Sequence, residues 1–529
     1  MSSNRRQVFN AAALVGVLFA FNSVWAYVRV QLIARYFGVS AEADAYAIVS
    51  PIPELLFTII AGGALGAAFI PVFASYFADE DAPDLEGAWS TFSAIINMVL
   101  VASIILSSVA AVFAPQLLAF FAEPGSETFE LAVPLLRIML WTPIIFGVGG
   151  VISATLNARQ HFLTPALGAN LYSLGIIGGL LLFPSDLMGI GYGVVAGALL
   201  YWLVQMPALI RLGGQYRPKS PVNTAAVRRI LWLMGPRVLG LSFSQFNPII
   251  VNLIAQSMLG GSIAALNFGF RIMLMPQTII GRALGVASFP TFAALAKQSK
   301  YAEMRRIFSD TIRLIVFIGV PITCGMILLA EPLIALALQY GAFDSTAALW
   351  TARALQFYAV ALVALAIIEI VSRSFYALED TMTPVIAGAI QLMAMLLLGL
   401  WFGRNLFPSQ GWVALGGIAL GFSLSNWIEV ALLLGLLRRK MKGIDGQRIL
   451  LGAGKMLVAG GLMSAAIQFL LLPLLNALDN TVVGLLIRLV VAGAFGVAVY
   501  AIACYALYVS EMRQAVAWVT ARFLRKSSS

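Results

Sequence analysis

The sequence predicts an all-α polytopic membrane protein with about fourteen transmembrane helices, arranged as two parallel six-helix lobes and a terminal helix pair. Three observations predict this fold. Hydrophobic residues make up 61% of the 529 residues and charged residues only 11%, whereas a soluble domain needs roughly 25% charged residues. Apolar runs recur from end to end. The sequence also resembles itself at an offset of 219 residues.

The apolar runs between polar breaks give the individual spans. A helix needs about 20 apolar residues to cross the hydrocarbon core. The predicted spans are 10–36, 45–76, 88–120, 131–157, 164–184, 188–212, 233–258, 264–296, 308–339, 349–377, 384–407, 411–437, 449–474 and 482–509. The first run is too long for the apolar core of a signal peptide, so we expect it to be a retained first span.

Lys and Arg residues set the orientation of these spans. With the N-terminus inside, the inside segments hold nearly all of the basic residues of the loops, and the outside loops hold little beyond Arg404. This asymmetry predicts a multi-pass membrane protein with both termini cytoplasmic. The net charge of +10 is therefore a topology signal. The basic residues are dispersed over many loops without interleaved aromatic residues, which argues against a nucleic-acid surface.

The internal repeat groups the spans. Ala64–Ala74 matches Ala283–Ala293 with Gly66, Pro71 and Phe73 in register, and Thr164-Pro165 meets Thr383-Pro384 at the same offset. The offset covers six helices, an even number, so the two halves run in the same direction. We expect an N-terminal lobe at 1–220, a second lobe at 221–442 and a terminal pair with a cytoplasmic tail at 443–529. In this architecture the substrate site is expected between the lobes.

The sequence carries no sign of a metal site, a cofactor or an ATP motor. Its two cysteines, Cys324 and Cys504, lie in apolar runs, and His161 is the only histidine, which disfavours a disulfide framework and His-rich metal sites. The segment Gly452–Lys455 lacks the first glycine of a phosphate loop. We therefore expect a transporter and not an enzyme, with no coupling ion identified.

Charges inside the predicted spans are candidate functional groups. A charge at mid-bilayer costs about 2.5–3.5 kcal/mol, so it usually faces a cavity or a partner. Arg271 and Arg282 lie within about 20° of one helical face, with Thr278 between them. Such a stripe suits a pyrophosphate, because each guanidinium presents paired donors. The predicted substrate-binding residues are Arg29, Arg271, Arg282, Glu54, Asn22 and Thr278.

Some of these residues have structural alternatives. Arg29 and Glu54 can also be explained by snorkelling near a helix end, and Arg271 by an ion pair within one lobe. Glu369 and Arg373 form an i, i+4 pair that neutralises both charges, and a structural role is also favoured for Glu429. The Gly62/Gly66 and Gly417/Gly421 spacings predict close helix contact or, in the second span, bending. The predicted structural or gating residues are Asp44, Gly62, Gly66, Pro71, Arg353, Glu369 and Arg373.

Several short motifs occur in one order along the chain. They are Ile33-Ala34-Arg35-Tyr36-Phe37-Gly38, Ala43-Asp44-Ala45-Tyr46, Gly63-Ala64-Leu65, Ala68-Phe69-Ile70-Pro71, Met234-Gly235-Pro236, Gln339-Tyr340-Gly341, Arg353-Ala354-Leu355 and Asp380-Thr381 followed by Thr383-Pro384. Together they resemble the MurJ/MviN family of lipid II flippases. The resemblance implies fourteen spans in two lobes plus a terminal pair, within a larger group that includes polysaccharide exporters and multidrug antiporters.

The resemblance also implies a location in the bacterial plasma membrane and a function. The family moves lipid-linked peptidoglycan precursor from the inner to the outer leaflet, and arginines of a cationic cavity face its pyrophosphate. Arg29 and Arg271 match family arginines. Ser23 and the Phe57-Thr58 pair stand where the family has two others, and Gly62 and Leu274 where acidic residues are frequent. The implied partners are a lipid-linked glycan, membrane lipids and other cell-wall synthesis proteins.

Three alternatives stay open at the level of sequence. The first is export of another polyprenyl-pyrophosphate-linked glycan, which uses the same cationic logic. The second is a drug/cation antiporter, which needs a dominant acidic cavity, and the arginines argue against it. The third is a non-transporting membrane scaffold of wall synthesis, which needs no convergent set of charges.

Overall fold

The structure is a computed structural model that describes residues 3–79, 82–256, 258, 260–409, 414–475, 479 and 481–517. Within these ranges the side chains of 3–17, 19–20, 63–64, 236–237, 239–244, 282, 286 and 409 lie outside the description. The described part of the chain is helical and contains no strand, which confirms the predicted fold class. It forms two compact units. Unit 1 runs to Ala264 and includes Tyr340–Phe343, and unit 2 comprises Ala265–Gln339 and the chain from Asp344. The predicted boundaries at 220 and 442 stay a prediction.

The predicted spans fall on helices. Within the described residues, eleven helices are long and apolar enough to cross a bilayer. A twelfth span is formed by α17 (Ser345–Tyr358) and α18 (Ala361–Ala377), which are bent by 45° at a short break. The two other predicted spans, 10–36 and 233–258, fall on the long helices α1 (Ser3–Phe37) and α12 (Ala225–Ala255). Together these helices account for the fourteen predicted spans.

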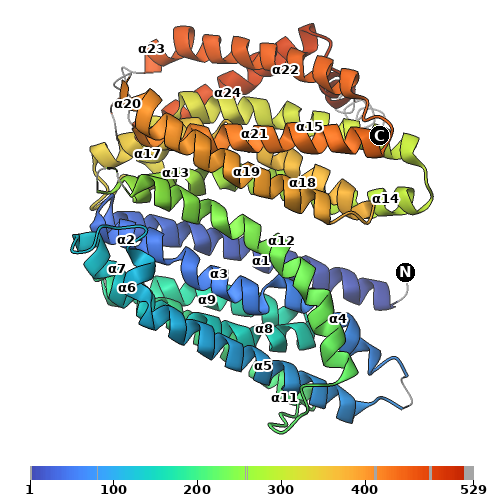
Figure 1. Ribbon diagram of the computed structural model, residues 1–529. Helices are drawn as coiled ribbons and strands as arrows, with labels where there is room; N and C mark the ends of the chain where they lie inside the picture. Colours follow the sequence, from blue (N-terminus) through green and yellow to red (C-terminus); the bar gives the residue numbers. More distant parts are fainter. Residues whose placement is uncertain are drawn as a thin grey trace. The chain divides into compact units, whose positions relative to one another are not determined.

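Unit 1 holds the first seven spans (Figure 1). After α1, its helices are α2 (Ala41–Val49), α3 (Pro51–Ala61), α4 (Gly63–Ser75), α5 (Leu85–Val112), α6 (Ala114–Leu118), α7 (Glu127–Met139), α8 (Thr142–Ala158), α9 (Leu163–Leu182), α10 (Leu187–Leu203), α11 (Met206–Arg211) and α12. A core of Leu65, Phe69, Phe73, Trp89 and Phe92 joins α4 to α5, and α8 and α12 also contribute to it. These residues recur at helical spacing on their apolar faces, as expected for spans that pack against each other.

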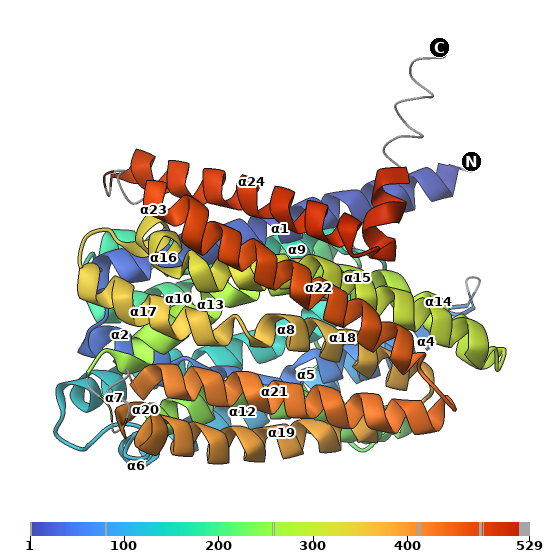
Figure 2. The ribbon, with the colours of Figure 1, turned by 90° about the horizontal axis from the view of Figure 1, so that it is seen from above.

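Unit 2 holds the later spans. Its helices are α13 (Ser262–Gln277, which starts in unit 1), the π-helical turn η1 (Thr278–Arg282), α14 (Ala283–Lys297), α15 (Tyr301–Leu328), α16 (Ala330–Leu338), α17, α18, α19 (Met382–Trp401), the π-helical turn η2 (Phe402–Leu406), α20 (Phe407–Ser409) and α21 (Ala414–Lys440). The terminal pair consists of α22 (Gly446–Ala466), continued by η3 (Ile467–Leu471) and α23 (Leu472–Leu475), and of α24 (Val482–Ala506). Helices α19 and α21 run side by side in both views (Figures 1 and 2).

Helix boundaries repeat at the predicted offset. Shifting α8 by 219 residues gives 361–377, the bounds of α18, and shifting α9 gives 382–401, the bounds of α19. The short helices that precede them, α7 and α17, also correspond to within a residue or two at their ends. The repeat detected in a few sequence motifs therefore extends to the helices themselves.

Glycines create two seams of close backbone contact. In unit 1, a Cβ on Gly175 of α9 would lie 2.3 Å from Gly197 Cα of α10, and one on Gly179 would lie 2.7 Å from Gly193 Cα. In unit 2, a Cβ on Gly417 would lie 2.6 Å from the carbonyl carbon of Phe402. These positions require glycine, because no real Cβ approaches another backbone so closely. The close contact predicted for Gly417 and Gly421 is confirmed.

The second predicted span is a broken helix. It divides at Ser50, where Pro51 begins α3, and again at Gly62, whose ψ of −174° ends α3 and starts α4. Among the described residues, no atom lies within 4 Å of a Cβ built on Gly66. The described residues therefore show no close contact at Gly66, and Gly62 lies at the bend that was predicted as the alternative. Pro71 continues α4 as an internal proline, as Pro290 does in α14.

The terminal pair is attached to α15 by charged side chains. Arg313 of α15 forms an ion pair with Glu511, with Nε 2.8 Å from Oε1, and its Nη2 donates to Ser510 Oγ at 2.6 Å. The two charged side chains are only 9% and 13% exposed. A second pair, Arg448 Nη2 to Asp310 Oδ1 at 2.9 Å, joins α22 to α15 at the surface.

Candidate functional site

Two predicted site residues lie on one face of α1. Asn22 and Arg29 are seven residues apart, which places them on one side of the helix, and both are half-buried. Asn22 Oδ1 accepts a hydrogen bond from Ser173 Oγ of α9 at 3.1 Å. In the part of the chain that the structure describes, Arg29 makes no hydrogen bond or ion pair. The donors of the Arg29 guanidinium are therefore not used by any described residue, whereas Asn22 is already bonded within unit 1.

The helix α3 carries an exposed acid and a substituted arginine position. Glu54 is exposed and, among the described residues, has no hydrogen-bond or ion-pair partner for its carboxylate. Thr58, where the resemblance leads one to expect arginine, is buried. Its Oγ1 donates to the Glu54 carbonyl at 2.8 Å and accepts from Gln245 Nε2 of α12 at 3.2 Å. A hydrogen bond between two neutral side chains, Thr58 of α3 and Gln245 of α12, therefore occupies the position where the family resemblance implies an arginine.

The segment from Arg271 to Arg282 is not one regular helix. Arg271 is half-buried on α13, and Thr278 is the first residue of η1. A π-helical turn holds an extra residue, which rotates the positions beyond it by about 100°. The predicted common face of Arg271 and Arg282 assumed an unbroken α-helix, and η1 interrupts that helix. The side chain of Arg282 lies outside the described residues, and the binding roles of Arg271, Thr278 and Arg282 stay predictions.

Glu369 and Arg373 form the predicted ion pair on α18. Arg373 Nη2 lies 2.5 Å from Glu369 Oε1. The pair packs on Gly285 of α14, because a Cβ there would lie 2.7 Å from Arg373 Nε. At the 219-residue offset, unit 1 has Gly150 and Ala154 in place of the pair and Gly66 in place of Gly285. The ion pair therefore belongs to one lobe only, and a mutual structural role explains both charges.

Arg353 lies on the surface of unit 2. It is exposed, its Nη2 is 3.5 Å from Glu331 Oε1 of α16, and its Nη1 donates to Gln356 Oε1 at 3.1 Å. These contacts connect α16 with α17. An exposed pair of this kind contributes about 0–1 kcal/mol, so its effect is one of local positioning.

Asp44 has a role that the sequence motif did not reveal. Its carboxylate is 4% exposed and accepts from the backbone N–H of Gly261 and of Ala264, each at 2.6 Å. Gly261 directly precedes α13 and Ala264 lies in its first turn, where a helix lacks internal acceptors. Asn252 Nδ2 donates to the Ala47 carbonyl at 2.8 Å and fixes α12 to α2 nearby. Asp44 thus ties α2 to the start of the helix that carries Arg271.

The chain segments around Asp44 are held by further backbone contacts. Ala342 N donates to the Arg35 carbonyl at 2.8 Å. Gly38 and Gly341 adopt positive φ, and a Cβ on either would lie within 2.4 Å of a carbonyl oxygen of the other segment. The family-like motif at 33–38 therefore meets Tyr340–Phe343, the segment that contains most of the second motif, within unit 1. Sequence order alone could not indicate this contact.

These features define a class of protein. Apolar helices whose bounds repeat at a fixed offset, some of them broken or bent, with charged side chains on α1 and α13, are typical of a membrane transporter built from an internal repeat. The chain matches the family described as "Lipid II flippase MurJ" over residues 33–492. It therefore belongs to the MurJ lipid II flippase family, which comprises transporters and not enzymes.

Comparison with individual proteins gives the same family. The chain is 29% identical over 428 residues to a probable lipid II flippase of Buchnera aphidicola subsp. Acyrthosiphon pisum, covering 79% of this chain and 81% of that protein. It is 27% identical to the lipid II flippase of Burkholderia cenocepacia, covering 72% and 75% of the two chains.

Solved structures show the same fold. The lipid II flippase in its inward closed conformation aligns with a TM-score of 0.76 at 24% identity, over 94% of this chain and 99% of that one. An inward-facing multidrug transporter of the MATE family aligns with a TM-score of 0.69 at 15% identity, over 80% and 96%. These likenesses establish the fold of a multi-pass membrane transporter.

Proposed function

We propose that this chain moves lipid II, the lipid-linked peptidoglycan precursor, from the inner to the outer leaflet of the bacterial inner membrane. The family match over residues 33–492 carries the proposal. No covalent chemistry is required. The sugar head-group and pyrophosphate pass through the protein, while the lipid tail stays in the bilayer.

Arg29 and Arg271 are the residues proposed to hold the pyrophosphate. Both match family arginines, and both lie within membrane spans, where a charge is retained for a function or a partner. A guanidinium forms paired charge-assisted hydrogen bonds with phosphate oxygens, each worth about 1.5–3 kcal/mol. Glu54, Asn22, Thr278 and Arg282 complete the proposed substrate-binding set.

The membrane potential can drive this export. In a membrane that is negative inside, moving two negative charges outward is favoured by about 4.6 kcal/mol per 100 mV. An energy source of this size needs no bound nucleotide. We also propose that both termini and the basic loops lie in the cytoplasm, because Lys and Arg accumulate on the cytoplasmic side of membrane proteins.

Single-cysteine labelling tests this orientation. Cysteines placed at Arg217 and Arg525 are expected to react with an impermeant maleimide only after the cells are opened. Strong labelling of either position in intact cells would reverse the proposed topology.

Complementation tests the function itself. Expression of this chain in a bacterium depleted of its own lipid II flippase should restore growth and lipid II translocation. Arg271→Ala should abolish the rescue with normal membrane insertion, and Arg271→Lys should restore only part of it, since the paired donor geometry is lost. Arg488→Ala, in α24 and outside the proposed site, is the control. Rescue by Arg271→Ala equal to wild type would reject the cationic site.

The same experiment separates the alternative functions. The substitutions at Ser23 and Thr58 favour, as a second candidate, the export of another polyprenyl-pyrophosphate-linked glycan, because the family arginines are absent there. Failure to move lipid II combined with transport of another such glycan would select this candidate. Growth rescue without any translocation would select a scaffold of wall synthesis.

A further inference from the structure

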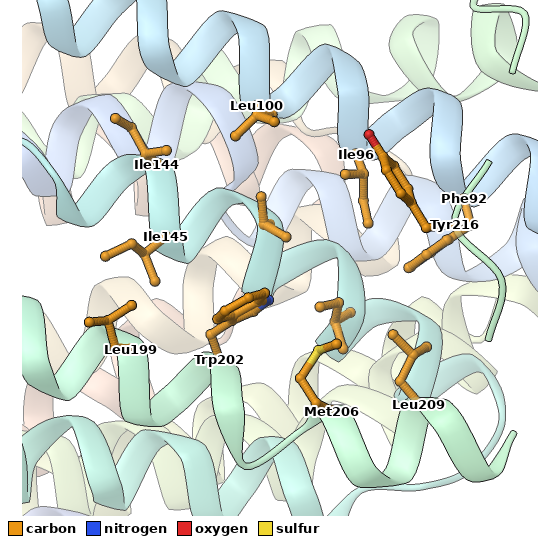
Figure 3. Close-up of a pocket in the computed structure, with 12 residues that line it drawn as sticks. Phe92, Ile96, Leu100, Ile144, Ile145, Leu199, Trp202, Met206, Leu209 and Tyr216 are labelled. Carbon is orange, nitrogen blue, oxygen red and sulfur yellow. The ribbon is translucent and has the colours of Figure 1, made fainter. Parts of the chain in front are cut away.

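Unit 1 contains an apolar pocket. It is lined by helices that carry none of the proposed substrate residues. It has a volume of about 460 Å³, within the roughly 300–1,000 Å³ of small-molecule sites. Its walls come from α5, α8, α10 and α11 (Figure 3). Figure 3 shows Ile145 and Leu199 at one end and Phe92 with Tyr216 at the other. Its walls are made almost entirely of apolar side chains.

The pocket is lined by helices of predicted membrane spans. The helices α5, α8 and α10 belong to three of the membrane spans. Leu199, which lines the pocket, is 40% exposed, so the pocket opens at the surface of unit 1. We expect exposed apolar side chains on a membrane span to face lipid. Because the hydrocarbon of the bilayer surrounds such a surface, the ligand that reaches the pocket most readily is a lipid chain. An apolar wall gains dispersion contacts only when such a chain fills it.

One end of the pocket is polar and carries basic side chains. Tyr216 belongs to the connector between α11 and α12, and its hydroxyl donates to Asn97 Oδ1 of α5 at 2.6 Å. Arg217 N donates to Ser93 Oγ at 2.8 Å. Its guanidinium is 3.0 Å from Glu86. Arg211 and Lys219 are exposed on the same stretch of chain. Arg217 is paired with Glu86, whereas Arg211 and Lys219 make no ion pair among the described residues. These two basic side chains are therefore available to an anionic head-group.

We infer that the pocket binds one acyl chain of an anionic glycerophospholipid, with the phosphate beside Tyr216 and Arg217. The basic end is the one placed in the cytoplasm, so the lipid comes from the cytoplasmic leaflet. The inference rests on the pocket and on this orientation, and does not depend on what the protein transports. The pocket is built within one lobe and ends at one membrane surface. A transported lipid must follow its head-group across the bilayer, so a fixed leaflet lipid suits the pocket better than the substrate tail.

The bound chain would support the connector to α12. Asn97 Nδ2 donates to the Pro218 carbonyl at 2.9 Å, so the connector is fastened along α5 directly beside the pocket. A chain packed under Tyr216 adds apolar contact to these hydrogen bonds. Lipid occupancy is therefore expected to slow local opening of the connector, which links the sixth and seventh spans.

Photo-crosslinking tests the site. The purified full-length chain in nanodiscs would be irradiated with phosphatidylglycerol that carries a diazirine on one acyl chain, and the adducts mapped by mass spectrometry. Adducts are expected on the pocket segments 92–100 and 144–152. Leu199→Trp fills the pocket and should remove them. Leu203→Trp is the matched control, because Leu203 is an exposed leucine one turn further along α10 that does not line the pocket. Ile145→Trp is a second filling variant if Leu199→Trp does not fold.

The head-group and the lipid source are tested separately. Arg217→Gln should weaken capture of phosphatidylglycerol about 5-fold, the effect of one basic residue near a membrane surface, whereas Lys300→Gln in unit 2 should not. A diacylglycerol probe with the same chains should label the pocket less than phosphatidylglycerol. Equal labelling of Leu199→Trp and Leu203→Trp would overturn the site. Equal labelling by diacylglycerol would overturn the phosphate contact. Preferential labelling by a polyprenyl-phosphate probe would assign the pocket to the substrate tail and overturn the proposal.

Discussion

Replacing Asp44 should loosen the start of α13. The first N–H groups of a helix have no internal acceptors, and in this helix the Asp44 carboxylate supplies two at 2.6 Å. Its negative charge also interacts favourably with the positive end of the helix dipole. Because the side chain is 4% exposed, water does not easily replace it.

The size of the effect follows from the two bonds. A hydrogen bond to a charged group contributes about 1.5–3 kcal/mol, so Asp44→Ala should lower the free energy of local opening by about 3–6 kcal/mol. Asp44→Asn keeps one acceptor and loses the charge, so roughly half of this loss is expected. At 1.4 kcal/mol per factor of ten, the alanine variant should lose about 100-fold or more of its protection.

Hydrogen–deuterium exchange of the Gly261 and Ala264 amides measures this opening directly. Both amides should exchange faster in the order wild type, Asp44→Asn, Asp44→Ala. Glu42→Ala, two residues away on α2, is the matched control and should leave both amides unchanged. Unaltered exchange in Asp44→Ala, or equal acceleration by Glu42→Ala, would refute the reasoning.

Three further predictions concern stability. Arg313→Ala leaves Glu511 buried without its ion-pair partner and should lower the free energy of unfolding by about 3–5 kcal/mol. Arg448→Ala breaks an exposed pair and should lower it by about 1 kcal/mol or less. Equal melting temperatures for the two variants would contradict this. Burial opposes ionisation of Asp380, but hydrogen bonds from Lys440 and Thr383 outweigh it and lower the pKa of Asp380 from 3.8 to about 2. The stabilisation by Asp380 should therefore be complete above pH 3.8 and lost as the pH falls through about 2, so the melting temperatures of wild type and Asp380→Asn should differ at pH 7 and converge in acid. Gly175→Leu should destabilise the protein by more than the roughly 1–3 kcal/mol typical of overpacking. Gly178→Leu should be tolerated, because no described atom lies within 4 Å of a Cβ built on this glycine of the same helix. Thermal unfolding of the two variants in detergent tests this difference.

Much of the fold followed from the sequence because hydrophobic length and repetition are local properties. The spans at 142–158 and 361–377 could be placed by their apolar runs and related by their offset. The breaks were harder to predict. Gly62 and the π-helical turn at Thr278–Arg282 depend on contacts with neighbouring helices, which a count of residues per turn does not contain.

The candidate site shows the same division. The Glu369–Arg373 pair could be predicted because its partners are four residues apart on one helix. The partners of Asp44 are backbone N–H groups more than 200 residues away, and Arg313 meets Glu511 at a similar separation. No spacing rule connects such positions, and only a family motif singled out Asp44.

The glycine seams constrain how this sequence can evolve. Gly175 and Gly179 face Gly197 and Gly193 across two backbones in contact. Every missense change at one of these codons adds a Cβ where the opposite chain already lies, and no second change at the facing glycine can remove it, because glycine is already the smallest residue. Compensation would require the two helices to move apart and all four positions to be refilled together. These glycines should therefore be inherited as a block, lost or kept as a set.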